Sequence, residues 1–171
     1  MIAVFNHVLF PDELHKRIKR EYEDKLDYIN DDLRNLYVYH ERDDNSWLWK
    51  EVAPFIHKNL GINYKLIQRV AVLKYEKGGY FKEHSDGPYN SSIAEYSGKR
   101  IPYHFYGGVE LSSESDFKGG EFITDGKAVE FRLGRMFTHD FDTLHEVKEV
   151  TEGTRWAIHF PIQPLVNNTV L

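Results

Sequence analysis

The 171-residue sequence contains no cysteine, which excludes disulfides and thiolate metal ligands. A metal site in this chain must use histidine, carboxylate or carbonyl oxygen, ligands that suit iron or manganese. The formal net charge of -5 disfavours proteins whose affinity comes from neutralising phosphates, so we do not expect a nucleic-acid partner. No apolar run approaches the roughly 18 residues of a membrane span. The apolar start "MIAVFNHVLF" has no preceding basic residues, so we expect no signal peptide, no membrane partner and a cytoplasmic location.

Hydrophobic residues make up 41% of the chain and aromatic residues 15%, which is enough for one core but hardly for two. We therefore expect a single domain over residues 1–171, with helical support in 1–62 and a β core in 67–162. After Pro11, apolar residues at a four-residue spacing predict an amphipathic helix: Leu14, Ile18, Tyr22 and Leu26. A second helix is predicted up to the capping Gly61 by Trp47, Val52, Phe55, Ile56 and Leu60. The charge-rich stretch 12–44 is interpreted as a solvated helix face and the loop after it.

From residue 67 onward, short runs of Val, Ile, Phe and Tyr alternate with Gly and Asp, which is typical of antiparallel β structure. The predicted fold class is therefore mainly β with N-terminal helices (α+β), built as a sandwich or barrel. The polar segment "GPYNSSIAEYSG" is predicted to be a mobile loop that acts as a lid. The predicted strands are 67–76, 80–86, 100–111, 121–124, 128–132, 135–139, 143–150 and 154–160.

The triplet His84-Ser85-Asp86 is the first candidate for a metal site. With 9 His and 27 Asp and Glu in the chain, roughly one such triplet is expected by chance, so the context must decide. Side chains two positions apart on a strand share a face, so His84 and Asp86 can approach one ion from the same side. A second histidine would complete two His and one carboxylate, the arrangement of non-haem Fe(II) oxygenases.

The segment "LHEVKEVTEGTRWAIHF" offers that second histidine as His145, together with Arg155. A turn at Glu152-Gly153 predicts a hairpin that carries the two on neighbouring strands. Arg155 would then pair beside Glu149, about 13 Å along the strand from His145. A metal and a guanidinium at this separation suit a short dicarboxylate, chelated at one end and paired with Arg155 at the other, which points to 2-oxoglutarate.

Two spaced motifs in this order resemble the Fe(II)/2-oxoglutarate-dependent dioxygenases, and within them the prolyl 4-hydroxylase-like branch. The resemblance runs from about Val70 to Phe160. "FKGGEF" between the motifs matches the turn before a core strand in that family. Glu149 stands where many members have proline, and Arg155 where collagen-type members have lysine, so the exact substrate does not follow. The first motif consists of Tyr75, Gly78, Gly79, Phe81, His84 and Asp86, and the second of His145, Val150, Gly153, Arg155 and Trp156.

The resemblance implies a double-stranded β-helix, or jelly roll, whose catalytic core is 67–162, with the two helices packed on one sheet. It implies Fe(II) bound by His84, Asp86 and His145, and 2-oxoglutarate bound by Arg155. Tyr75 and, as a weaker candidate, Tyr106 would add hydrogen bonds to the co-substrate. The implied reaction uses O2 and couples decarboxylation of 2-oxoglutarate to succinate with hydroxylation of a C–H bond, with ascorbate as an optional addition.

Other interpretations of the same residues remain open. His139 in "FTHD" is the rival distal ligand. His159 shares strand parity with Arg155 and could line the pocket, but it is interpreted as a satisfied core histidine. Arg155 can instead form a structural ion pair, and Phe81 is interpreted as a core aromatic. The three tryptophans are expected to pack the helices on the sheet: Trp47, Trp49 and Trp156.

The favoured substrate is proline in a peptide, by resemblance to the branch. The alternatives are the same chemistry on a free amino acid or other small molecule, or a non-catalytic jelly roll that binds metal. An alkylated base is disfavoured by the acidic net charge and by the absence of a second arginine in "WAIHF". The sequence makes no prediction of the oligomeric state.

Overall fold

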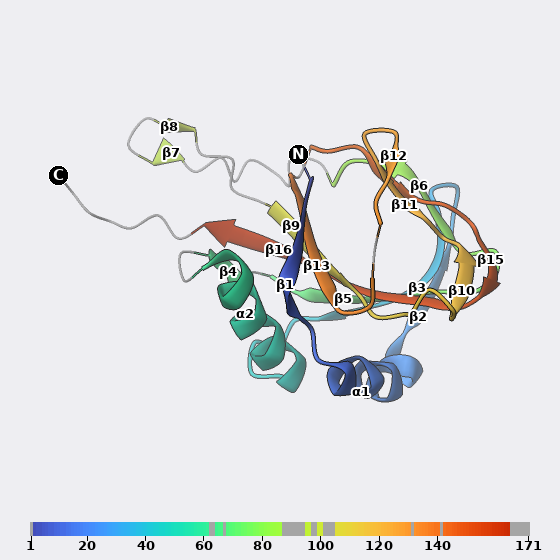
Figure 1. The fold of residues 1–171 in the computed structure, drawn as a ribbon, viewed down its shortest axis with the longest axis horizontal. Helices are drawn as coiled ribbons and strands as arrows, with labels where there is room; N and C mark the ends of the chain where they lie inside the picture. Colours follow the sequence, from blue (N-terminus) through green and yellow to red (C-terminus); the bar gives the residue numbers. More distant parts are fainter. Residues whose placement is uncertain are drawn as a thin grey trace.

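The computed structural model describes residues 2–61, 64–66, 68–86, 95–96, 99–100, 105–130, 132–140 and 142–164. Two α-helices, α1 (Asp12–Tyr22) and α2 (Trp47–Leu60), lie among many short strands (Figure 1). The strands are β1 (Ile2–Leu9), β2 (Asp27–Asn30), β3 (Arg34–Glu41), β4 (Tyr64–Leu66), β5 (Val70–Tyr75), β6 (Tyr80–His84), β7 (Glu95–Tyr96), β8 (Lys99–Arg100), β9 (Phe105–Glu110), β10 (Phe117–Gly119), β11 (Phe122–Thr124), β12 (Lys127–Ala128), β13 (Arg135–Asp140), β14 (His145–Val147), β15 (Val150–Gly153) and β16 (Arg155–Pro164).

One large antiparallel sheet organises the molecule, and it curls upon itself (Figure 1). Its order is β1-β13-β9-β16-β5-β3-β6-β14-β11-β12, with β2 beside β3 and β4 beside β16. Strands β11 and β13 are far apart in this order, yet the rings of Phe122 and Phe137 lie 5.2 Å apart across the interior. The curl therefore brings opposite walls of the sheet together around an apolar interior, as the jelly-roll prediction requires.

Both predicted helices are present and pack on one face of the sheet. The first is preceded by Pro11, and the second is capped when the Ser46 hydroxyl accepts a hydrogen bond from the Trp49 N–H at 3.2 Å. Gly61 ends the second helix at φ 95°, a backbone angle that favours glycine. The buried helix residues join the strands in one cluster that includes Ile18, Tyr22, Leu48, Val52, Phe55, Ile56, Val70, Val72, Ile158 and Phe160.

The prediction that residues 12–44 form only a helix face and a loop is wrong, because β2 and β3 lie in this stretch. Strand β3 lies between β5 and β6 within the sheet, and it buries Leu36 and Val38. Its last residue, Glu41, accepts a hydrogen bond from the buried Tyr22 hydroxyl at 2.8 Å, which ties the strand to α1. Residues 1–62 therefore supply strands β1, β2 and β3 as well as helical support. The flanking charges masked the strand alternation of "RNLYVYHE" in the sequence.

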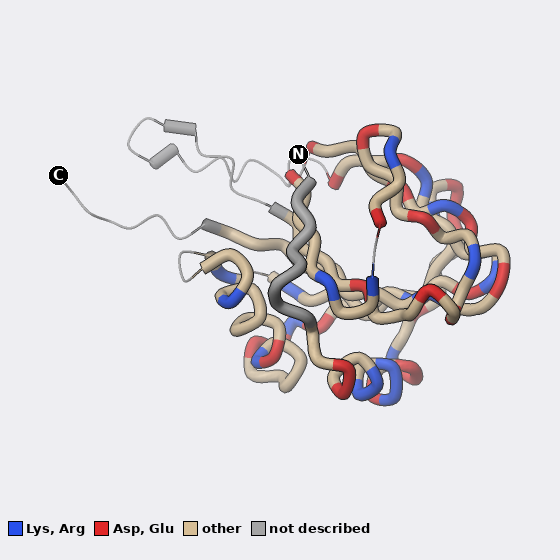
Figure 2. The backbone as a smooth tube through the Cα atoms, in the orientation of Figure 1, with Lys and Arg blue, Asp and Glu red and all other residues tan. Residues whose placement is uncertain are grey.

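Several predicted strands differ from those observed at their ends. The stretch 143–150 bends into two strands, β14 and β15, and 67–76 shortens to β5 with β4 before it. Most of the predicted lid, residues 87–94 and 97–98, lies outside the described residues. Among the described helices, none is long and apolar enough to cross a membrane. Figure 2 shows both signs of charge interspersed along α1 and over the turns near β10 and β15, without a block of one sign.

The packing of α2 gives a test of the fold. Leu48 is 0% exposed, so Leu48→Ala should leave a cavity and lower the free energy of unfolding by about 2–5 kcal/mol. Leu33 is 39% exposed, and Leu33→Ala should change the free energy by no more than about 0.5 kcal/mol. Urea denaturation followed by circular dichroism measures both. Equal losses in the two variants would contradict the assignment of Leu48 to the core.

Candidate metal centre and co-substrate pocket

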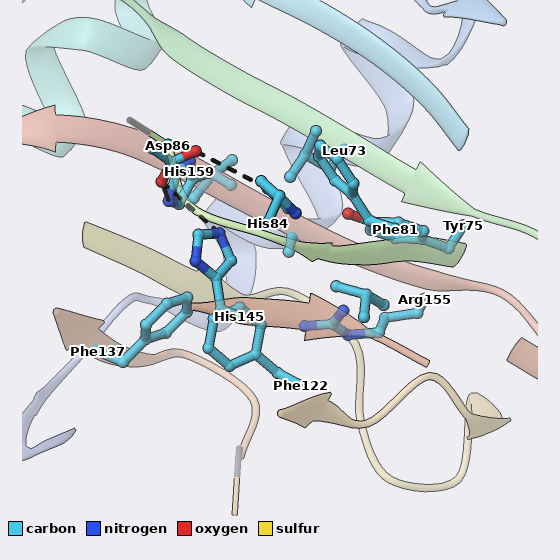
Figure 3. A pocket seen from close by; sticks show the side chains of 13 residues that line it. Leu73, Tyr75, Phe81, His84, Asp86, Phe122, Phe137, His145, Arg155 and His159 are labelled. Atoms are coloured by element: carbon cyan, nitrogen blue, oxygen red, sulfur yellow. Dashed lines mark ion pairs between the residues drawn. The ribbon is translucent and has the colours of Figure 1, made fainter. Parts of the chain in front are cut away.

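Two paired strands bring the first three candidate ligands together. His84 is the last residue of β6, and Asp86 follows two positions later. His145 begins β14 and lies directly opposite His84 in the antiparallel register. The Nε2 atom of His84 lies 4.0 Å from Asp86 Oδ1, and Nε2 of His145 lies 3.7 Å from Asp86 Oδ2. Ligand atoms of these three side chains all lie within 4.8 Å of one another, which suits one metal ion (Figure 3).

Hydrogen bonds to the backbone orient the two imidazoles. Nδ1 of His84 donates to the carbonyl of Lys82 at 2.7 Å, and Nδ1 of His145 donates to the carbonyl of Thr143 at 2.9 Å. With the proton on Nδ1, the lone pair of each Nε2 is left to face Asp86, which is how metal-binding histidines are usually held. Burial lowers the pKa of both His84 and His145, which favours the neutral, ligating form.

The carboxylate of Asp86 is the unusual group of the site. Its Oδ2 atom is buried and has no hydrogen-bond partner among the described residues. Burial raises the pKa of Asp86 to about 6, against the opposing effect of His84 and Arg69. A buried carboxylate oxygen without a partner is costly, and a bound cation would remove that cost. The donor set therefore fits a divalent metal such as Fe(II).

A second set of potential ligands shares the same carboxylate. Nε2 of His139 and Nε2 of His159 lie 3.9 and 4.0 Å from Asp86 Oδ2. The two imidazoles also lie 3.3 Å apart through these same atoms. The rival ligand His139 is therefore beside Asp86. His159 is beside Asp86 too and lines the cavity, which is the alternative to the core interpretation of this residue.

Arg155 and Tyr75 extend the cavity away from the histidines. They lie opposite each other in the register of β16 and β5, with the guanidinium carbon 5.5 Å from the centre of the Tyr75 ring. Figure 3 shows the guanidinium directed into the space that the ligand side chains also line. Burial raises the pKa of Tyr75 to about 12, so its hydroxyl stays protonated and able to donate. The cavity is also lined by Leu73, Phe81, Phe122, Phe137, Val147 and Ala157.

Arg155 also has a buried partner that sequence reasoning missed. Its Nε donates to Glu110 Oε2 at 2.9 Å, and both side chains are almost fully buried. The structural ion pair considered for Arg155 is therefore present, while the same side chain lines the cavity. Tyr106 does not line this cavity. Its ring stacks on His159, with centroids 4.9 Å apart. Phe81, interpreted as a core aromatic, lines the cavity and stacks on His84 at 3.8 Å.

The predicted hairpin between His145 and Arg155 is wrong. Strand β14 pairs with β6 and β11, whereas β15 pairs with β10, and β16 pairs with β5, β9 and β4. The turn at Gly153 has φ 73°, and a Cβ there would lie 2.0 Å from the carbonyl oxygen of Asp116. Because Gly153 has no side chain, β15 can pair closely with β10 before the chain continues into β16, which pairs with β5. His145 and Arg155 thus reach one cavity from separate strand pairings.

The two motifs meet in the structure through the Gly78-Gly79 turn of the first and Val150 of the second. The N–H of Gly78 donates to the carbonyl of Val150 at 2.8 Å, and the N–H of Val150 donates to the carbonyl of Gly79 at 2.9 Å. The N–H of Gly120, in the "FKGGEF" segment, donates to the carbonyl of Glu149 at 3.0 Å. These bonds fix the segment that follows His145 against the turn that precedes His84, which explains why both spacings occur together.

Comparison with known proteins gives similar proteins of one kind, although no family model matches the chain. A protein named PKHD-type hydroxylase from Nitrobacter winogradskyi is 28% identical over 183 residues, covering 97% of this chain and 80% of that protein. The 2-oxoglutarate and iron-dependent oxygenase domain-containing protein 3 of Xenopus tropicalis is 30% identical over 129 residues. That alignment covers 68% of this chain and 40% of the relative, so the chain spans less than half of it.

Solved structures share the fold at low sequence identity. A prolyl-4-hydroxylase of Pseudomonas putida superposes with a TM-score of 0.69 at 14% identity, covering 95% of this chain and 92% of its own. A Trichoplax adhaerens prolyl hydroxylase, solved with a peptide fragment of hypoxia inducible factor, gives 0.65 at 16% identity, with coverage of 95% and 83%. HygX of Streptomyces hygroscopicus, solved with nickel, 2-oxoglutarate and hygromycin B, gives 0.65 at 14% identity, with coverage of 95% and 82%.

These comparisons confirm the jelly-roll fold class and the resemblance to the Fe(II)/2-oxoglutarate-dependent dioxygenases. The relatives are named as hydroxylases and as a protein with a 2-oxoglutarate and iron-dependent oxygenase domain, and the solved structures share the fold of enzymes of that class. Within that class, the chain is similar to PKHD-type hydroxylases in sequence and to prolyl 4-hydroxylases in fold.

Metal analysis can decide between the two ligand sets. Loaded anaerobically with Fe(II) and desalted, the wild-type chain is expected to retain about one metal ion. His84→Ala, Asp86→Ala and His145→Ala should each lose it, because each removes one of the three proposed ligands. His139→Ala is the matched control and should keep the metal. Loss in His139→Ala with retention in His145→Ala would instead assign the metal to Asp86, His139 and His159.

Proposed function

We propose that this chain is an Fe(II)- and 2-oxoglutarate-dependent dioxygenase that hydroxylates peptidyl proline. The observation that carries the proposal is the shared cavity, in which an oxygen of Asp86 that has no hydrogen-bond partner among the described residues faces two oriented imidazoles while Arg155 lines the same space. A metal at one end and a guanidinium at the other match the two ends of a dicarboxylate.

The side chains divide into three roles. His84, Asp86 and His145 would hold the metal, as two His and one carboxylate do in non-haem Fe(II) oxygenases. Bound iron and 2-oxoglutarate supply oxidative decarboxylation to succinate coupled to hydroxylation of a C–H bond. Arg155 would fix the distal carboxylate of 2-oxoglutarate, and the Tyr75 hydroxyl could donate to it. The lining rings, among them Phe81 and Phe122, exclude water from the reacting atoms.

The proposed catalytic unit is residues 67–162, because this stretch contains the three ligands and Arg155. The segment before it supports the unit through the helices and through β3, which pairs with both β5 and β6. Those two strands carry Tyr75 and His84. We propose that the two segments together form one functional domain.

The choice of peptidyl proline rests on the kinds of similar proteins. The neighbours include prolyl hydroxylases, one of them bound to a peptide. The alternative, a small molecule, is favoured by HygX, whose comparable fold was solved with hygromycin B. A non-catalytic metal-binding jelly roll is the third possibility, and it predicts that 2-oxoglutarate is not turned over at all.

Arg155→Ala should weaken 2-oxoglutarate binding by about 2–5 kcal/mol, because a buried carboxylate would lose its charged partner. Arg155→Lys should lose less, since the charge remains although the Nε donor to Glu110 is gone. Isothermal titration calorimetry with Mn(II)-loaded protein measures both without turnover. An unchanged affinity in Arg155→Ala would show that another residue anchors the co-substrate.

The reaction itself is tested with Fe(II), 2-oxoglutarate and a panel of short proline-containing peptides. We expect succinate release together with a gain of about 16 Da on peptidyl proline, the mass of one inserted oxygen atom, as for C–H hydroxylation by this class of iron site. Asp86→Ala is the inactive control. Hydroxylation of free proline or another metabolite, with none on peptides, would establish the small-molecule alternative. Absence of succinate under all conditions would favour the non-catalytic jelly roll.

A further inference from the structure

Glu110 is a buried acid at the end of β9 whose two oxygens are both engaged. Its side chain is 2% exposed. Oε2 accepts from Nε of Arg155 at 2.9 Å, and Oε1 accepts from the backbone N–H of Ser112 at 3.2 Å. The carboxylate therefore holds one edge of a guanidinium that has five N–H donors in a fixed plane.

The strands around Glu110 leave this pair little freedom to separate. The N–H of Leu111 donates to the carbonyl of Trp156 at 2.9 Å, and the N–H of Trp156 donates to the Ser112 hydroxyl at 2.8 Å. These bonds join the residues that directly follow Glu110 to the residue that directly follows Arg155. The ion pair is thus built into the junction of β9 and β16.

A second carboxylate beside Arg155 would change the net charge of the buried Arg155–Glu110 pair. The charged or titratable groups that face Glu110 are Arg155 on β16 and Tyr75 on β5, with the exposed Glu114 and Glu121 at the rim of the adjoining cavity. Without co-substrate, Arg155 and Glu110 neutralise each other. A carboxylate brought to Arg155 leaves one excess negative charge in a buried place, which is unfavourable. Burial already raises the pKa of Glu110 above its ordinary value, although Arg155 opposes the rise.

We propose, on the basis of the proposed function, that Glu110 is a positioning residue for the co-substrate that holds Arg155 through Nε and takes up one proton when 2-oxoglutarate binds. The proton comes from solvent and converts the Glu110 carboxylate to the neutral acid. The buried site then contains one guanidinium and one carboxylate again. The neutral acid keeps its carbonyl oxygen as an acceptor for Arg155, so the guanidinium remains in place.

Proton uptake by Glu110 makes the affinity for 2-oxoglutarate decrease as the pH rises. Co-substrate binding raises the pKa of Glu110, so affinity is greatest at pH values below the pKa of the free protein. Between the pKa values of the free and bound protein, affinity should fall about tenfold for each unit of rising pH, because one proton is bound with each ligand. A pH-independent affinity is expected when residue 110 cannot ionise.

The experiment is calorimetric titration of Mn(II)-loaded protein with 2-oxoglutarate in two buffers of different ionisation enthalpy at one neutral pH. The wild-type chain should take up about one proton per ligand, and Glu110→Gln, which keeps an acceptor of the same size, close to none. Glu114→Gln is the matched control, because it removes an exposed acid from the same cavity and should behave as wild type. Thermal unfolding confirms that each variant is folded.

The outcomes separate this inference from the proposed function. Failure of the wild-type chain to bind 2-oxoglutarate would overturn the co-substrate assignment and the role of Glu110 with it. Binding without proton uptake by the wild-type chain, or with the same uptake in Glu110→Gln, would overturn the role of Glu110 alone. The wild-type result depends on no variant, so the proposal is tested even where Glu110→Gln does not fold.

Discussion

A carboxylate oxygen that the fold buries without a partner is the constraint on which the rest of the site depends. Oδ2 of Asp86 is enclosed by imidazoles and receives no hydrogen bond from the described residues. Burial of an unpaired charge costs several kcal/mol, so such a group persists where a cation or a proton compensates it. The backbone carbonyls of Lys82 and Thr143 take the Nδ1 protons of His84 and His145, which leaves lone pairs directed at the same point. The protein therefore presents a preformed, electron-rich centre rather than a set of surface charges.

The curled sheet is what makes this centre possible. His84 and His145 come from two adjacent strands, β6 and β14, while Arg155 comes from β16, which β5 and β3 separate from β6 in the strand order. The curl brings β16 across the interior, so that Arg155 shares a cavity with the histidines. Strand β3 fixes the turn that connects β5 to β6, because it pairs with β5 on one side and with β6 on the other. A chain of antiparallel pairings thus sets the separation between the metal ligands and the guanidinium.

The sequence predicted local features well and long-range pairings poorly. The helices followed from four-residue periodicity and the capping Gly61, and the strand-rich core from its β-branched and aromatic runs. The candidate ligands were found because a His-x-Asp spacing and a His-to-Arg spacing are local patterns. Strand β3 was missed because its short apolar alternation lies between charged stretches. The hairpin between His145 and Arg155 was wrong, and Glu110 was missed, because both depend on which distant strands pair. A single glutamate in a strand carries no signal of a partner 45 positions away.

The four imidazoles around Asp86 are not equivalent, and the difference favours one metal set over the other. Nε2 of His139 and Nε2 of His159 face each other at hydrogen-bonding distance, 3.3 Å, so these two rings can satisfy one another without a metal. Both also stack on Tyr106, which supports them as a packed aromatic layer. His84 and His145 direct Nε2 at the carboxylate from strands that pair in register. Their Nδ1 hydrogen bonds to backbone carbonyls do not set them apart, because Nδ1 of His139 donates in the same way to the carbonyl of Asp140 at 3.0 Å. The cavity with Arg155 includes these two histidines and His159 but not His139. His84, Asp86 and His145 all line the cavity that Arg155 also lines, so a dicarboxylate in that cavity could contact both a metal held by these three residues and the guanidinium.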